Sequence, residues 1–273
     1  MVGTAVRESL LGHELITPAK HELNIGNFDQ IMKFAKKQPG YIIHLASETD
    51  HEYCEQNPSQ CYFVNTIGTY NMVNLAHKLS IPIIYISTAS IFDGNTTVPY
   101  NGSAIPNPIN HYNRSKWLGE IMVRSYRKHF ILRCGWMFGG GPNVDKKFVK
   151  KIIDKVNCGE KRIKVCDDCV GSPTYSMDVA EVIGQIIDKY AYAFGTYNCV
   201  NRSDGVSRYE FAKEIIKCLK KNNVRIMRCK IDDLKEEFPC KRTNYEVLRN
   251  SFDHIMRDWK PALKEYINAY NNH

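Results

Sequence analysis

The sequence has neither a long apolar run nor a regular cysteine framework. Among its 273 residues no hydrophobic stretch approaches the roughly 20 residues that a membrane-spanning helix needs. No signal-peptide pattern opens it. Its ten cysteines are scattered through a chain much longer than disulfide-stapled secreted scaffolds. We therefore expect a cytoplasmic protein without a membrane segment, since disulfides are rare in that reducing compartment.

Signatures of metal and nucleic-acid binding are also missing. The nine histidines show no HExxH spacing, and the Cys-Asp-Asp-Cys stretch at 166–169 has no second ligand pair at a suitable distance. The net charge is +8, but the basic residues are mostly spread along expected helices rather than gathered in a patch. The one basic cluster, at 146–151, is either a solvated helix face or a positive field for an anionic small molecule. We expect neither a metal nor a nucleic-acid partner.

Short apolar strands alternate with helices along the chain. Apolar runs predict strands at 13–17, 41–46, 81–88, 130–134, around 163–165, and at 195–199. Helical periodicity predicts helices at 1–11, 28–37, 58–79, 112–128, 144–157 and 176–190, with a mostly helical tail from 201. Because hairpin signals are missing, the pattern predicts an α/β fold with a parallel sheet covered by helices on both faces.

Tyr112 and Lys116 carry the clearest chemical signal. Residues four apart project from one face of a helix. A phenol with its ordinary pKa of about 10 is a poor proton donor, and a neighbouring ammonium lowers that pKa by favouring the phenolate. Thr88, at the end of the predicted strand 81–88, could add a hydroxyl. Together these groups would pass a proton to or from a carbonyl oxygen.

The same spacing recurs at Tyr209 and Lys213, so the pair alone is weak evidence. The surrounding residues there have the period of an ordinary amphipathic helix, and we interpret that pair as structural. Tyr112 and Lys116 differ because a strand ending in Ser87 and Thr88 precedes them. A loop rich in Pro, Asn and Gly then leads to the tyrosine.

Several stretches together resemble the extended short-chain dehydrogenase/reductase family, over nearly the whole chain. Within it the resemblance is to the dTDP-4-dehydrorhamnose reductase family and its UDP-sugar counterparts. The matching stretches are 44–50, 64–65, 85–94, 106–120, 133–139, 167–168, 171–175 and 241–244. The resemblance implies a Rossmann-type doubly wound parallel sheet at 1–141 and 174–200, and a smaller C-terminal substrate lobe at 142–173 and 201–273.

The activity implied by the resemblance is NAD(P)H-dependent reduction of the 4-keto group of a dTDP- or UDP-linked 4-keto-6-deoxy sugar to NDP-L-rhamnose. Tyr112 would protonate the oxygen, Lys116 would bind the nicotinamide ribose, and Thr88 would hydrogen-bond the reacting oxygen. Further implied cofactor contacts are Gly3, Lys20, Asn24, Leu45, Ala46, Asn65 and Ser87. The implied substrate contacts are Ser90, Trp136, Lys147 and Arg242.

Several of these residues also have a plainer interpretation. Lys20 could meet the 2′-phosphate of NADPH, which favours that cofactor over NADH, or could be a surface lysine. Asn65 could bond the backbone within its helix, and Trp136 could be core packing. Arg242, whose guanidinium matches phosphate oxygens, could instead be solvated.

The sequence departs from the family pattern in three places. Gly3 fits the last glycine of the family's Gly-x-x-Gly-x-x-Gly, while the preceding strand and glycines are absent, so we expect upstream residues to be missing. Asn113 stands where the family usually has glycine. Relatives that also epimerise have a cysteine near the place of Ser90. Without it, 3,5-epimerisation would need other groups, such as Lys146 or Lys147, and dual activity stays open.

Two other functions remain open on this fold. One is a binding subunit resembling the regulatory beta subunit of methionine adenosyltransferase, and the other is an NDP-sugar epimerase or dehydratase. A scaffold has no need of the Thr88, Tyr112 and Lys116 group, so its presence favours an enzyme. We expect a nucleoside-diphosphate sugar as substrate and a 4,6-dehydratase or epimerase as pathway partner, and we leave a homodimer open.

Overall fold

A parallel sheet of four strands forms the centre of the computed structural model, which describes residues 1–189 and 193–271. Its order is β1–β2–β3–β8. The strands are β1 (Ile42–His44), β2 (Ile83–Thr88), β3 (His129–Cys134) and β8 (Gly195–Asn198). The two central strands are almost entirely buried, as expected for a parallel sheet covered on both faces. The expected fold class is confirmed.

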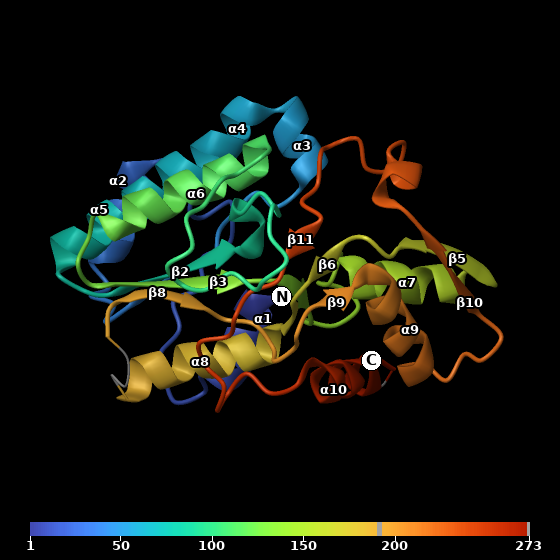
Figure 1. The fold of residues 1–273 in the computed structure, drawn as a ribbon. Helices are drawn as coiled ribbons and strands as arrows, with labels where there is room; N and C mark the ends of the chain where they lie inside the picture. Colours follow the sequence, from blue (N-terminus) through green and yellow to red (C-terminus); the bar gives the residue numbers. More distant parts are fainter. Residues whose placement is uncertain (190–192, 272–273) are drawn as a thin grey trace.

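Helices cover both faces of this sheet (Figure 1). One face carries α2 (Phe28–Ala35), α3 (His51–Gln56), α4 (Pro58–Tyr62), α5 (Thr69–Leu79) and α6 (His111–Arg124). The other carries α1 (Val2–Ser9) and α8 (Ser176–Lys189), which pack against each other. A π-helical turn at Phe63–Gly68 joins α4 to α5, and a 3₁₀ turn at Ala89–Ile91 follows β2.

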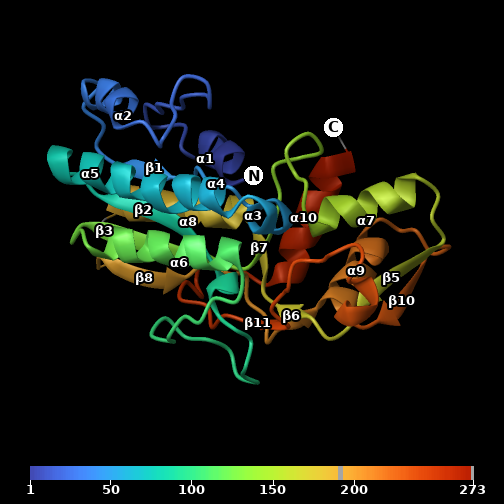
Figure 2. The ribbon, with the colours of Figure 1, turned by 90° about the horizontal axis from the view of Figure 1, so that it is seen from above.

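A second group of elements lies beside the sheet (Figure 2). It contains the parallel pair β5 (Arg162–Cys166) and β10 (Arg225–Cys229), with α7 (Phe148–Asn157), α9 (Arg208–Cys218), α10 (Trp259–Asn271) and a 3₁₀ turn at Ile231–Leu234. Between this group and the sheet lie the short strands β6 (Val170–Gly171), β7 (Pro173–Tyr175) and β11 (Tyr245–Glu246). The strand β4 (Trp136–Phe138) pairs with β7, and β9 (Val206–Ser207) pairs with β6. An apolar core of its own, which includes Val149, Phe211 and Leu263, holds the group together.

The sequence prediction was wrong at three elements. Residues 13–17 form no strand, because no neighbouring strand within the described chain offers them a hydrogen-bond ladder. The helix expected at 144–157 begins only at Phe148, after a loop. The tail from 201 contains three strands as well as two long helices, so it is not mostly helical.

The chain returns from the second group to the sheet near residues 247–251. Tyr100 donates its backbone N–H to the Val247 carbonyl oxygen, and the side-chain amide of Asn198 donates to the carbonyl of Arg249. These bonds tie the C-terminal segment to β8 and to the loop after β2. The proposed boundaries between sheet domain and lobe stay predictions. None of the helices in the described ranges has the length and apolar character to cross a membrane.

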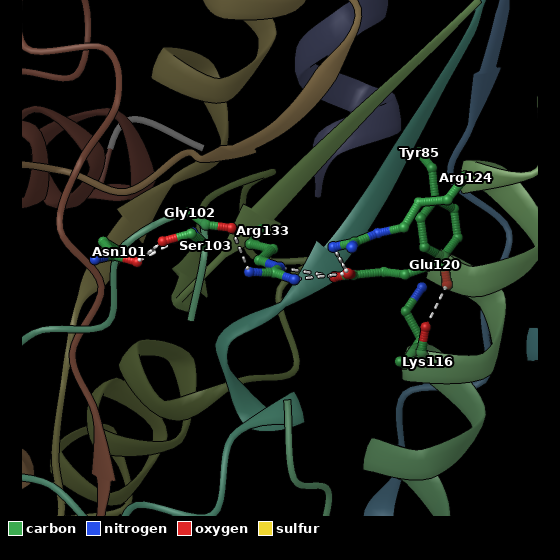
Figure 3. Close-up of polar contacts among 8 residues, drawn as sticks. All are labelled: Tyr85, Asn101, Gly102, Ser103, Lys116, Glu120, Arg124 and Arg133. Carbon is green, nitrogen blue, oxygen red and sulfur yellow. Dashed lines mark hydrogen bonds and ion pairs between the residues drawn. The ribbon is translucent and has the colours of Figure 1, made fainter. Parts of the chain in front are cut away.

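A buried ion pair fixes α6 against the sheet (Figure 3). Arg133 on β3 donates from Nε to Glu120 Oε1 at 3.0 Å and from Nη2 to Oε2 at 2.9 Å, and both side chains are 0% exposed. Arg133 also donates to the Gly102 carbonyl at 3.3 Å in the loop between β2 and α6. The pair therefore sets the position of the helix that carries Tyr112 and Lys116.

Candidate active site

The three predicted catalytic residues lie on two neighbouring elements, β2 and α6. Thr88 is the last residue of β2, while Tyr112 and Lys116 lie in the first two turns of α6. The helix begins where it does because Asn110 caps it, its Oδ1 accepting the backbone N–H of Asn113 at 2.8 Å. Proteins with an open parallel sheet bind their ligands at the carboxyl ends of the strands, which is where Thr88 lies.

The Thr88 hydroxyl links the backbone after β2 to the Tyr112 phenol. Thr88 Oγ1 accepts the backbone N–H of Ser90 at 3.2 Å. A side-chain hydrogen bond between Thr88 and Tyr112 acts to lower the pKa of the phenol. Two hydrogen bonds therefore connect the Ser90 backbone, the Thr88 hydroxyl and the Tyr112 phenol.

The net effect on the Tyr112 phenol is a raised pKa, because burial outweighs the Thr88 hydrogen bond. This is opposite to the direction predicted from the neighbouring ammonium. The buried ring loses the water that would solvate a phenolate, and that loss dominates. The phenol is therefore protonated at neutral pH, which is the form that can donate a proton to a carbonyl oxygen.

The Lys116 amine lies beside the C-terminal end of β2. Its Nζ donates to the Ile86 carbonyl at 2.8 Å and lies 4.2 Å from the centre of the Tyr85 ring. Burial lowers its pKa to about 7, and the charge of Glu120 acts in the opposite direction. Within the described residues Ile86 provides its one hydrogen-bond acceptor, so further amine hydrogens remain for a ligand.

Sequence reasoning missed His51, which packs directly on Tyr112. The two ring centroids are 4.3 Å apart. Asn110 donates from Nδ2 to His51 Nδ1 at 3.4 Å. Burial and the positive charges of Arg242, Lys147 and Arg208 lower the pKa of His51 well below its usual range. Its position just after the matching stretch 44–50 was the one available signal.

Asn65 was predicted to contact the cofactor, but its amide is fully used inside the protein. Oδ1 accepts from the Ser47 hydroxyl at 2.9 Å and the Glu48 backbone N–H at 2.8 Å. Nδ2 donates to the Glu48 carbonyl and to Ser115 Oγ, both at 2.9 Å. Its visible role is to fasten the loop after β1 to α6, and cofactor contact by this side chain stays a prediction.

The other predicted cofactor residues divide into two groups. Gly3 and Leu45 pack together near the start of α1, where a Cβ on Gly3 would make only ordinary contact with Leu45 at 3.6 Å. Ala46 is exposed beside them. Lys20 and Asn24 lie in an exposed turn region, where Asn24 Oδ1 accepts the Gly26 N–H at 2.9 Å. Nucleotide contact by both groups stays a prediction.

Two buried polar side chains next to the catalytic residues have unmet hydrogen-bonding capacity. Ser87 Oγ and both amide atoms of Asn113 are buried without a partner in the described structure. Buried polar groups are normally paired. Together with the Lys116 amine hydrogens that Ile86 does not use, this unmet capacity fits a polar ligand such as a nicotinamide nucleotide.

Two of the predicted substrate residues, Lys147 and Arg242, lie close enough to His51 to lower the pKa of its imidazole. Lys147, just before α7, donates from Nζ to Thr49 Oγ1 at 3.1 Å. Arg242 forms an ion pair with Glu52 at 2.5 Å, so it is not the freely solvated arginine of the alternative interpretation. Ser90 is buried, and the sequence signal for its contact with a sugar stays untested.

Trp136 is packed from several sides. Its Nε1 donates to Glu246 Oε2 at 2.8 Å, and the Arg208 guanidinium lies 3.5 Å from its ring centre. A Cβ on Gly171 would collide with the ring. Burial lowers the pKa of Arg208 to about 10, and no sequence motif had indicated this residue. The core-packing interpretation of Trp136 therefore has direct support, while sugar contact stays a prediction.

The Cys-Asp-Asp-Cys turn brings potential ligand atoms closer than the sequence suggested. The thiols of Cys166 and Cys169 and the carboxylate of Asp168 lie within 4.8 Å of one another. Asp168 already accepts the Ile231 backbone N–H at 2.9 Å. The hydrogen bond with Cys169 lowers the pKa of the Cys166 thiol, and the positive charge of Arg208 lowers it further.

Known proteins are similar to this chain in both sequence and fold. The chain matches the family described as "RmlD substrate binding domain" over residues 1–272. The spore coat polysaccharide biosynthesis protein SpsK of Bacillus subtilis (strain 168) is 30% identical over 263 residues, which cover 94% of this chain and 89% of SpsK. Methionine adenosyltransferase 2 subunit beta of Xenopus laevis is 30% identical over 154 residues, covering 56% of this chain and 46% of that protein.

Among solved structures, dTDP-4-dehydrorhamnose reductase from Bacillus anthracis str. Ames, in complex with NADP, superposes with a TM-score of 0.89. It is 28% identical, and the match covers 98% of this chain and 95% of that one. Because the family match spans nearly the entire chain, the protein belongs to the RmlD family of extended short-chain dehydrogenase/reductases and is an NAD(P)H-dependent oxidoreductase.

Proposed function

We propose that this protein uses NADPH to reduce the 4-keto group of a dTDP- or UDP-linked 4-keto-6-deoxy sugar, giving NDP-L-rhamnose. The observation that carries the proposal is the hydrogen-bonded series from the Ser90 N–H through Thr88 to Tyr112. A protonated phenol at its end supplies the proton that a ketone oxygen needs as the carbonyl is reduced. The likeness to dTDP-4-dehydrorhamnose reductase supports the choice of substrate class.

Positive charge near the phenol supports an anionic substrate. Lys147, Arg208 and Arg242 all lie close enough to His51 to lower the pKa of its imidazole. Guanidinium groups match phosphate oxygens in geometry, and a cleft lined with cations attracts a nucleotide diphosphate. Binding the diphosphate would require Arg242 to share or exchange its bond with Glu52.

A bound nicotinamide cofactor would supply the hydride. Lys116 would hold its ribose with the amine hydrogens not used by Ile86, and Leu45 and Ala46 would border it after β1. Lys20 would favour the 2′-phosphate of NADPH, with NADH as the alternative. Tyr112 and Lys116 are both buried, so the surrounding protein would keep water away from the reacting groups.

The pathway setting is part of the proposal. A 4,6-dehydratase acting on an NDP-hexose must supply the keto sugar, and the ten free thiols suit a reducing cytoplasm. We assign epimerisation at carbons 3 and 5 to a separate enzyme, because Ser90 stands near the place of the cysteine that epimerising relatives use. Whether the base is thymine or uracil is left to experiment.

The test measures NADPH absorbance with dTDP- and UDP-4-keto-6-deoxyglucose, each with and without an added 3,5-epimerase. We expect consumption only when the epimerase is present. Tyr112→Phe should lower turnover roughly 10²–10⁴-fold, the usual contribution of a general acid, without weakening NADPH binding. The matched control is Tyr209→Phe, at the second Tyr-x-x-x-Lys pair, and it should keep wild-type turnover.

Two results would count against the proposal. Undiminished turnover in Tyr112→Phe would remove the assigned proton donor. If no keto sugar consumes NADPH and the protein instead raises the activity of a methionine adenosyltransferase, the binding-subunit alternative is correct.

A further inference from the structure

His51 is held in an orientation that gives it a defined chemical role. Its ring lies against Tyr112, with 4.3 Å between the ring centroids. It is the first residue of α3, whose N-cap Asp50 accepts the Tyr53 backbone N–H at 3.1 Å. The imidazole is therefore placed by a capped helix start rather than by a free loop.

Asn110 fixes which ring nitrogen of His51 carries the proton. Its Oδ1 accepts the Asn113 N–H at 2.8 Å, and its Nδ2 donates to the Lys241 carbonyl at 3.0 Å. These two bonds determine the orientation of the amide, so the group facing His51 Nδ1 is the NH₂. An amide nitrogen only donates, and Nδ1 must therefore accept.

The proton of the neutral ring consequently lies on Nε2, at the opposite side of the imidazole from Asn110. Burial and the cations Lys147, Arg208 and Arg242 oppose a second proton on the ring. The charged and titratable groups around His51 also include the Tyr112 phenol and the carboxylates of its chain neighbours Asp50 and Glu52, of which Glu52 is paired with Arg242. Within the described residues Nε2 has no hydrogen-bond partner, which leaves it as a donor next to the phenol.

We propose that His51 is a substrate-positioning residue whose Nε2–H donates to the sugar hydroxyl on the carbon beside the ketone that Tyr112 protonates. The inference rests on the proposed function. Oxygens on neighbouring carbons of a sugar ring lie close together. The packed rings of His51 and Tyr112 each carry a donor, so they can hydrogen-bond two such oxygens at once. The contact selects keto sugars that keep this hydroxyl and aligns the ketone with Tyr112.

The test compares His51→Leu and His51→Gln with the wild type, using the keto sugar and its analogue without the 3-hydroxyl. His51→Leu should raise KM for the keto sugar roughly tenfold, the cost of one lost hydrogen bond, with a smaller change in kcat. His51→Gln keeps an N–H donor and should recover part of the loss. The wild type should handle the deoxy analogue about tenfold less well, whereas His51→Leu should not distinguish the two sugars.

A measurement independent of turnover examines the tautomer. Nitrogen-15 NMR of the wild type should show the proton of His51 on Nε2. Asn110→Asp keeps the helix cap but replaces the NH₂ donor by an acceptor, so it should move the proton to Nδ1. This variant should also raise KM in the way that His51→Leu does.

The outcomes separate the two proposals. Wild-type turnover with equal KM in His51→Leu, or equal discrimination against the deoxy analogue in both proteins, overturns the role of His51 and leaves the reductase intact. A wild-type proton on Nδ1 overturns the role of His51 even if no keto sugar is turned over. Lack of turnover in the wild type with every keto sugar overturns the proposed function instead.

Discussion

Gly119 on α6 lies so close to Tyr85 on β2 that a Cβ at Gly119 would come 2.4 Å from the Tyr85 hydroxyl oxygen. The same atom would come 2.9 Å from the Asn65 carbonyl oxygen, which is backbone and cannot move aside as a side chain can. Tyr85 donates to the Lys116 carbonyl at 3.4 Å (Figure 3) and stacks on His44. Close approach of α6 to β2 thus depends on a residue without a side chain.

Gly119→Ala should therefore destabilise the protein, although the same change in an exposed helix gains about 1 kcal/mol. Overpacking in a buried contact typically costs about 1–3 kcal/mol. The matched control is Gly184→Ala in α8, where the new Cβ would meet only the movable tip of Leu10 at 3.1 Å. Urea unfolding measures both variants. Equal or higher stability of Gly119→Ala would contradict the close contact.

Glu120→Gln should cost much more than a surface change. It leaves the Arg133 guanidinium buried with no opposite charge, and removing one partner of a buried ion pair costs about 3–5 kcal/mol. Arg124→Gln is the control, since Arg124 also bonds Glu120 but is 39% exposed, and it should cost less than about 1 kcal/mol. Denaturant unfolding at neutral pH compares them, and similar losses in the two variants would refute this account.

His44 should make stability fall in acid. Burial lowers its pKa to about 3, while the unfolded chain takes up the proton near its usual value of 6.5. Between these two values the unfolded state binds more protons, so the free energy of unfolding falls as pH falls, by at most about 1.4 kcal/mol per pH unit. His44→Gln should flatten the curve between pH 6.5 and 3, with His51 still contributing. Parallel curves for the two proteins would exclude this role.

The sheet was predictable from local pattern, because β2 and β3 are apolar runs of the length that a buried strand needs. Residues 13–17 contain the apolar pair Leu15 and Ile16, yet whether they form a strand depends on a neighbour far away in the sequence. Pairing is non-local information. The local preferences of the residues in one sequence do not show which distant strands pair.

The site was predictable to the extent that its residues belong to a motif. Thr88 and Tyr112 meet because the end of β2 and the start of α6 share one edge of the fold. His51 and Arg208 belong to no spacing pattern, and their importance arises from contacts with Tyr112 and Trp136 that only the folded chain creates. The direction of the pKa shift of Tyr112 was missed because burial is a property of the fold.

Helix ends usually open and close at little cost. The first turn of α6 differs, because the amide of Asn110 is bonded to residues 59 and 131 positions away in the chain. Unwinding that turn would detach His51 and the backbone at Lys241 together. The acid group of the site is thus kept in place by distant parts of the chain, and exchange of the amide hydrogens in this turn should report on the folding of all three segments at once.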